Sequence, residues 1–332
     1  MTYRQTTHWV SMLLGTVAML IVANALAQQA VDAGFQPPKL SPRYAHASGP
    51  LVCVDEGHNN FHTLDRRFTP FALLLHADGY QTTSISEKFD KADLAKCRIL
   101  VIANALPGDE NWDAYPYPTP SAFSNEEAIS LRRWVERGGA LLLIADHMPF
   151  PGAAEKIALV FGFEFNDGFA VENFITEPEG RAAFEKPTLF QSDDGTLVDH
   201  PIVRGDGISN RVNKVRTFTG QAFRAPEGAQ PLLRLPGEFI SLMPEKAWRF
   251  TLDTKRIPVG GWLQGAVMQV GTGRLAVFGE AGMFTAQVQT DNGRVVPMGM
   301  NAPHAELNYR FILNLMRWLS PAGQVEPKEK QK

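Results

Sequence analysis

Apolar and polar positions follow two distinct patterns along this chain. The runs at 51–54, 98–103 and 140–145 are almost wholly apolar, as in strands that are covered on both faces of a sheet. Helix signals lie between them: Ser124 and Glu127 form a capping-box pattern. Apolar strands that alternate with amphipathic helices predict an α/β fold with a doubly wound, mostly parallel sheet.

The middle third of the chain, residues 163–265, has a different pattern. It is richer in Pro and Gly, with short β-like pieces and no helical period, so we interpret it as a β-rich elaboration on the sheet. Regular order returns with a predicted hairpin around Gly271 and a final helix over 305–319. Residues 50–320 are therefore predicted to form a single α/β domain.

The two ends of the chain are predicted to lie outside this domain. Residues 1–27 combine Arg4, an apolar stretch and a final Ala-x-Ala pattern, which predicts a cleaved signal peptide. An uncleaved N-terminal anchor is the alternative. Residues 28–49 are interpreted as a surface lead-in, and residues 321–332 as a disordered tail.

Composition narrows the classes of partner. The chain is 44% hydrophobic and 20% charged, which is ordinary for a globular protein of enzyme size. Its net charge of −3 gives no reason to expect nucleic acid as a partner. We expect no stable membrane span after cleavage, and a periplasmic or secreted location.

The two cysteines raise the question of a disulfide, because exported proteins often carry them. Cys53 lies near the end of one predicted strand, whereas Cys97 precedes the start of its neighbour. An offset of about four residues along parallel strands amounts to roughly 13 Å, beyond the reach of a disulfide. The sequence therefore predicts that they are unpaired.

Polar side chains gather where the predicted strands end. The carboxyl ends of parallel strands share one edge of an open sheet, where ligands bind. The candidate catalytic residues at these ends are Asp55, His58, Asp146, His147 and Glu280. The candidate substrate-binding residues are Glu56, Asn59, Asn60, Asn104 and Asn301.

Most of these residues also have a structural interpretation. The stretch from Asp55 to Asn60 fits a polar turn, Asp146 and Glu280 fit acids at helix starts, and Asn301 fits a turn before Pro303. The histidines are harder to explain in this way, since a turn does not need imidazoles.

Three kinds of chemistry remain open at this edge. His58, His62, Asp146 and His147 offer ligands for zinc or a similar divalent metal. Alternatively, His147 or His58 acts as a base without a metal.

A binding module is the third hypothesis. It predicts a groove for a polar or carbohydrate-like ligand, walled by the aromatic loop residues Trp112, Tyr115 and Tyr117. Nucleophile-elbow and phosphate-loop patterns are absent from the sequence.

Several segments carry a resemblance to known proteins. They are 55–63 (DEGHNNFHT), 138–147 (GGALLLIADH), 199–205 (DHPIVRG), 273–280 (GRLAVFGE) and 308–319 (NYRFILNLMRWL). The chain resembles a domain-of-unknown-function family of exported bacterial proteins. That family is similar to the class I glutamine-amidotransferase-like group, which includes ThuA-like proteins and GldG-type transporter domains.

The resemblance implies a flavodoxin-like core with a site at the strand ends. It does not imply glutamine hydrolysis, because neither Cys53 nor Cys97 follows a strand as the amidotransferase nucleophile does. The leading hypothesis is an exported hydrolase-like or lyase-like enzyme acting on a small polar or carbohydrate-derived substrate, with metal assistance as one option. The alternative is a non-catalytic ligand-binding or cell-envelope assembly domain.

Overall fold

The structure is a computed structural model that describes residues 29–89, 91–108, 115–173, 188–291 and 294–321. The predicted signal peptide, Trp112 and all but the first residue of the predicted tail lie outside these ranges. Within them, no helix is both long and apolar enough to cross a membrane.

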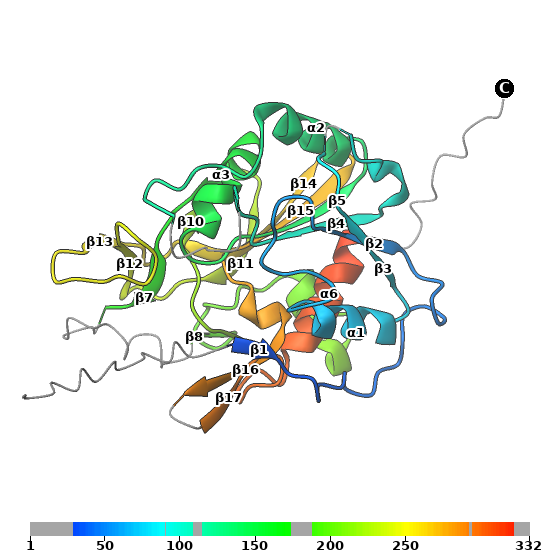
Figure 1. Cartoon of the computed structure of the whole chain (residues 1–332). Coiled ribbons are helices and arrows are strands. Elements are labelled where there is room, and N and C mark those ends of the chain that lie inside the picture. The colour runs from blue at the N-terminus through cyan, green and yellow to red at the C-terminus, as the bar shows by residue number, and fades with distance from the viewer. Residues whose placement is uncertain (1–28, 90, 109–114, 174–187, 292–293, 322–332) are drawn as a thin grey trace, which may run out of the picture.

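A mixed sheet of nine strands forms the centre of the protein (Figure 1). Its parallel strands, in spatial order, are β3 (Gln81–Ile85), β2 (Leu51–Asp55), β4 (Ile99–Ala103), β5 (Ala140–Ile144) and β15 (Gly273–Phe278). The sheet continues with antiparallel strands: β14 (Leu263–Val270), β10 (Phe223–Arg224), β6 (Glu164–Phe165) and β11 (Gln230–Arg234).

Helices cover both faces of the parallel strands. They are α1 (Thr69–Ala77), α2 (Asn125–Glu136), α3 (Phe150–Val160), the short α5 (Pro201–Arg204) and α6 (Asn308–Leu319). Alternate residues of β4 belong to two separate apolar clusters: Val101 packs with α1 and α6, and Leu100 packs with α2 and α3. This explains why the strand is apolar at every position.

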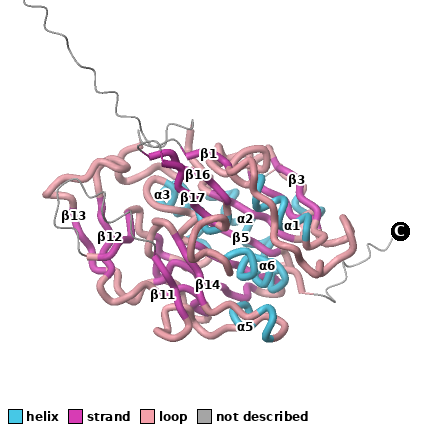
Figure 2. The backbone as a smooth tube through the Cα atoms, turned by 90° about the horizontal axis from the view of Figure 1, so that it is seen from below, coloured by secondary structure: helices cyan, strands magenta, loops and turns pink. Residues whose placement is uncertain are grey.

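The middle third is β-rich: its strands β6, β10 and β11 extend the central sheet, and its other strands form smaller antiparallel sheets. They contain β7 (Phe169–Glu172), β12 (Phe239–Met243) and β13 (Lys255–Pro258), and separately β8 (Thr188–Gln191) and β9 (Lys214–Thr217). In both views, β12 and β13 lie at the end of the molecule opposite β3 (Figures 1 and 2).

A third small sheet joins the lead-in segment to the C-terminal part of the chain. Its strand order is β1 (Gln29–Val31), β16 (Ala286–Asp291) and β17 (Arg294–Gly299), so β17 is an edge strand among the described residues. The side chains of Val295 and Val296 are 64% and 45% exposed on this edge, and Pro297 follows them.

The expectation that the cysteines are unpaired is wrong. Cys53 and Cys97 form a disulfide, with their Cα atoms 5.7 Å apart. The register pairs Cys53 with Leu100, and the 5.7 Å between the Cα atoms of Cys53 and Cys97 shows that the chain does not run straight into β4. It arrives from a 3₁₀ turn at Leu94–Lys96, and both cysteines are buried in the same apolar cluster on one face of the sheet.

We predict that replacing both cysteines by alanine lowers the free energy of unfolding by about 4 kcal/mol. The bond closes a loop with a sequence separation of 44, and cross-linking such a loop restricts the unfolded chain. Urea unfolding of the Cys53→Ala/Cys97→Ala variant checks this value. Oxidised wild-type protein should also present no thiol to alkylation when denatured; two alkylated cysteines would contradict the pairing.

Candidate functional site

The carboxyl ends of β2, β4, β5 and β15 lie side by side because the strands are parallel and in register. Four predicted residues follow or end these strands, and all are buried: Asp55, Asn104, Asp146 and Glu280. Their burial requires partners, since an unpaired polar group in the interior is costly. The partners show what each residue does.

His58 lies in a buried hydrogen-bonded network with two acidic side chains. Its Nδ1 is 2.9 Å from both carboxylate oxygens of Asp55, and its Nε2 is 2.9 Å from Oε1 of Glu127. The imidazole also packs against the rings of Phe89 and Phe123, at centroid distances of 4.6 and 4.3 Å. Both ring nitrogens are engaged, and the side chain is fully buried.

Glu127 was not among the predicted site residues, although the sequence marked it as the capping-box acid. It performs that role: its Oε2 accepts from the amide of Ser124, and Oγ of Ser124 accepts from the amide of Glu127. Burial alone would raise the pKa of Glu127. Hydrogen bonds from Ser124 and His58 outweigh burial and hold this pKa below its usual value.

We predict that His58→Leu lowers the free energy of unfolding by about 3 kcal/mol or more, because it leaves two buried carboxylates without their shared partner. Urea unfolding followed by circular dichroism measures the change. A variant as stable as the wild type would show that the network contributes nothing to the fold.

Asp146 and Glu280 form a second buried group. Asp146 accepts from the amides of His147 (2.8 Å) and Ala281 (3.2 Å), and Glu280 accepts from those of Gly282 (2.6 Å) and Met283 (2.7 Å). Burial, and next the charge of Asp146, raise the pKa of Glu280 well above its usual value. The two acids therefore interact across this edge of the sheet.

His62 and His147 form a third group at the same edge. His62 is 3% exposed, and its Nδ1 has no hydrogen-bond partner among the described residues. Burial lowers the pKa of His62 to about 3, with further contributions from Arg67 and His147. His62 is therefore a neutral imidazole near a second one.

His147 is held by a hydrogen bond and by aromatic rings. Its Nδ1 lies 2.8 Å from the carbonyl oxygen of Met148, and a carbonyl can only accept, so Nδ1 carries a proton. The imidazole stacks on Phe169 at 4.6 Å, with Trp248 edge-on at 4.9 Å. Phe169 and Trp248 come from the β-rich elaboration and were not predicted as site residues.

The remaining predicted binding residues hold loops in place. Asn104, with a positive φ of 55°, accepts from the amide of Asp146 through Oδ1 at 2.9 Å. Glu56 accepts from the amide of Leu64. Asn59 donates to the carbonyl oxygen of Leu106, and Asn60 to that of Ala103.

Two of these asparagines differ in their setting. Asn60 is buried, and no described residue donates a hydrogen bond to its Oδ1. Asn301 lies beside the small β1–β16 sheet instead, where its amide donates to Asp32 and to the carbonyl oxygen of Gln287.

The structure does not bring the proposed metal ligands together as one set. Within the described ranges, no three His, Cys, Asp or Glu side chains are placed to hold a metal ion. Of the predicted ligands His58, His62, Asp146 and His147, the first is enclosed by Asp55 and Glu127. The disulfide also leaves neither cysteine as a thiol.

We predict that acid destabilises the protein partly through His62. Its folded pKa of about 3 lies below the ordinary histidine pKa of 6.5, so the stability that depends on neutral His62 is complete above pH 6.5 and is lost as the pH falls toward 3. One such group changes the free energy of unfolding by about 1.4 kcal/mol per pH unit within this range. His62→Gln should flatten the fall in unfolding free energy between pH 6.5 and 4.5, measured with urea.

The exposed His304 provides the matched control for this measurement. His304→Gln should retain the pH dependence of the wild type. The explanation fails if both variants show the same dependence.

Comparison with known proteins supports the fold only. No protein-family model and no curated protein matches the chain. The structure is similar to the mmIFT52 N-terminal domain, with 13% identity and a TM-score of 0.54, over 83% of this chain and 100% of that one.

Two further likenesses are looser. A putative ThuA-like protein from Bacteroides uniformis has 11% identity and a TM-score of 0.45, over 84% of this chain and 95% of that one. The exo-beta-1,4-mannosidase Op5Man5 from an Opitutaceae bacterium has 13% identity and a TM-score of 0.35, over 70% and 31%. Likenesses this loose carry no argument about activity.

Proposed function

We propose that the parallel strands form a doubly wound, flavodoxin-like core of the class I glutamine-amidotransferase-like kind. Numbered along the chain, the strand order β3-β2-β4-β5-β15 is 2-1-3-4-5, the order typical of flavodoxin-like sheets. The helices on both faces also support this proposal. Membership in the resembling family of exported proteins rests on the sequence segments alone.

We also propose that the protein is exported, with residues 1–27 as its signal peptide. The disulfide between Cys53 and Cys97 supports this location, because such bonds persist in oxidising compartments and are rare in the cytosol.

We infer that the protein binds a small polar or carbohydrate-derived ligand at the carboxyl edge of the parallel strands. The observation that carries this proposal is the grouping of His147 with Trp248 and Phe169. An aromatic surface beside a polar ring supplies the apolar face and the hydrogen bond that orient such a ligand. Trp248 is 37% exposed, and so it can contact a ligand.

The aromatic loop that was predicted to wall a ligand groove lies near the same group of residues. The described part of the loop pairs with the segment that carries Trp248: Pro116 forms a β-bridge with Lys246, and the amide of Tyr117 donates to the carbonyl oxygen of Glu245. Tyr117 is 51% exposed.

Ligand binding is favoured over catalysis because most of the predicted catalytic groups have structural partners. Asp55 and His58 belong to a fully buried network, and Asp146 and Glu280 accept from backbone amides. A catalytic group has to reach the substrate.

A hydrolase-like or lyase-like enzyme remains the second candidate, and one observation favours it. Glu280 has a raised pKa beside Asp146, and neutral His62 lies close to His147. Acids and imidazoles with pKa values shifted by their surroundings are typical of acid–base sites.

We predict that His147→Phe weakens sugar binding about tenfold, because it retains the stacking on Phe169 but loses the ring nitrogens. Saturation-transfer NMR with cellobiose, chitobiose and galacturonate measures the affinity, and Trp248→Ala tests the apolar face. His304→Ala is the control. The proposal is rejected if the wild-type protein binds none of the three sugars. It is also rejected if the His147→Phe variant binds them as tightly as the wild type does.

The same proteins separate the two candidates when they are assayed with the p-nitrophenyl glycosides of these sugars. Binding without turnover supports a binding domain. Turnover that Glu280→Gln abolishes while affinity is retained would establish the enzyme instead.

A further inference from the structure

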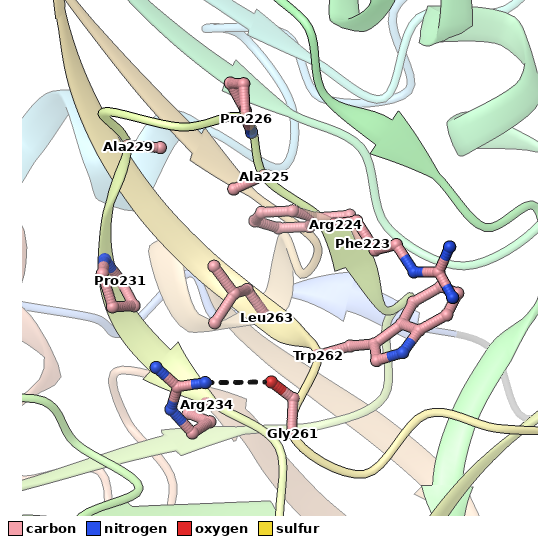
Figure 3. Close-up of a pocket in the computed structure, with 10 residues that line it drawn as sticks. All are labelled: Phe223, Arg224, Ala225, Pro226, Ala229, Pro231, Arg234, Gly261, Trp262 and Leu263. Carbon is pink, nitrogen blue, oxygen red and sulfur yellow. Dashed lines mark hydrogen bonds between the residues drawn. The ribbon is translucent and has the colours of Figure 1, made fainter.

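A pocket of about 370 Å³ opens on the antiparallel part of the sheet, between β10, β11 and β14 (Figure 3). It shares no residue with the candidate site at the carboxyl edge of the parallel strands. Pro226, Pro231 and Leu263 contribute apolar surface to it, and the fully buried Phe223 lies beneath them. Two of these are proline rings, whose flat faces suit contact with another ring.

Two arginines line the same pocket, and none of the described residues that line it is acidic. The guanidinium of Arg234 donates to the carbonyl oxygen of Gly261 at 3.1 Å, as the dashed line in Figure 3 shows. That bond uses one N–H group of the Arg234 guanidinium and orients its plane. The guanidinium has further N–H groups that can donate to a ligand.

The backbone presents Arg234 at this position through an irregularity in β11. The register between β11 and β14 shifts on either side of Leu233. Bulges of this kind redirect side chains and are frequent beside binding sites. Arg234 therefore stands at the edge of the pocket on a paired strand and not on a loop.

Arg224 and Trp262 form the opposite wall. The guanidinium carbon of Arg224 lies 4.3 Å from the centroid of the Trp262 ring, within the range of a cation–π contact. Arg224 also approaches Glu164 at 3.7 Å, but both side chains are more than 60% exposed. An ion pair so exposed contributes little, so Glu164 does not neutralise the pocket.

We propose that this pocket binds a small aromatic carboxylate. The carboxylate receives N–H groups from the Arg234 guanidinium, which matches it in a planar, bidentate way. The ring of the ligand lies over Leu263 and the prolines, against the wall made by Arg224 and Trp262. This site is separate from the proposed function and adds an anionic ligand class to it.

Benzoate is the direct probe, and benzamide is its uncharged counterpart of nearly the same shape. Calorimetry on the full protein at low salt should show saturable binding of benzoate and at least about tenfold weaker binding of benzamide. Arg234→Gln should weaken benzoate about tenfold, and Arg234→Lys should recover only part of the loss.

Two control variants locate the site. Arg256→Gln removes an exposed arginine of β13 outside the pocket and should bind benzoate as the wild type does. His147→Phe should also leave benzoate binding unchanged, so failure of the sugar-binding proposal and failure of this one can be told apart. Circular dichroism confirms that each variant folds.

Four results would each overturn the inference. They are benzamide binding as tightly as benzoate, unchanged binding in Arg234→Gln, loss of binding in His147→Phe, and no saturation up to about 10 mM benzoate. Phenyl phosphate tests the choice of a carboxylate. If it binds more tightly than benzoate, and Arg234→Gln abolishes the difference, the ligand is a phosphate and not a carboxylate.

Discussion

The buried contact of His58 with Asp55 and Glu127 is the interaction on which the edge of the sheet depends. It joins three segments far apart in sequence: the end of β2, the segment at Phe89, whose amide donates to Glu127 at 3.2 Å, and the start of α2. Because both acids and the imidazole are desolvated, each requires the others. The network therefore fixes where the polar loop after β2 begins.

The polar residues at this edge consequently fall into two classes. Asp55, Asp146 and Glu280 accept hydrogen bonds that shape the loops, and Glu280 does so with a raised pKa. His147 is instead held among aromatic rings, and His62 has a ring nitrogen with no partner among the described residues. The residues of the first class fix the conformation of the loops at the edge of the sheet. Those of the second class supply the side chains that we propose contact a ligand. Rigid support of this kind is what a precise binding site needs.

The sequence predicted local features well and long-range contacts poorly. The apolar runs at β4 and β5 were recognisable because both faces of those strands are covered, and the capping box marked the start of α2. The disulfide was missed because its geometry depends on the path of the chain into β4.

The contacts around His147 could not be predicted for a related reason. Phe169 and Trp248 belong to a region without clear periodicity, and they reach His147 only through tertiary packing. The edge of the sheet could be located from the strand ends, but whether His58 faces a ligand or the interior depends on Glu127.

The edge strand β17 has a consequence for association between copies of the chain. Two exposed valines on a strand that pairs with β16 on one side, and with no described strand on the other, are a template for the growth of a sheet into a neighbouring molecule. Pro297, which lies opposite Val288 in the ladder, has no N–H group to offer an incoming strand. The hairpin thus carries its own barrier to aggregation, and replacing this proline would remove that barrier while the fold persists.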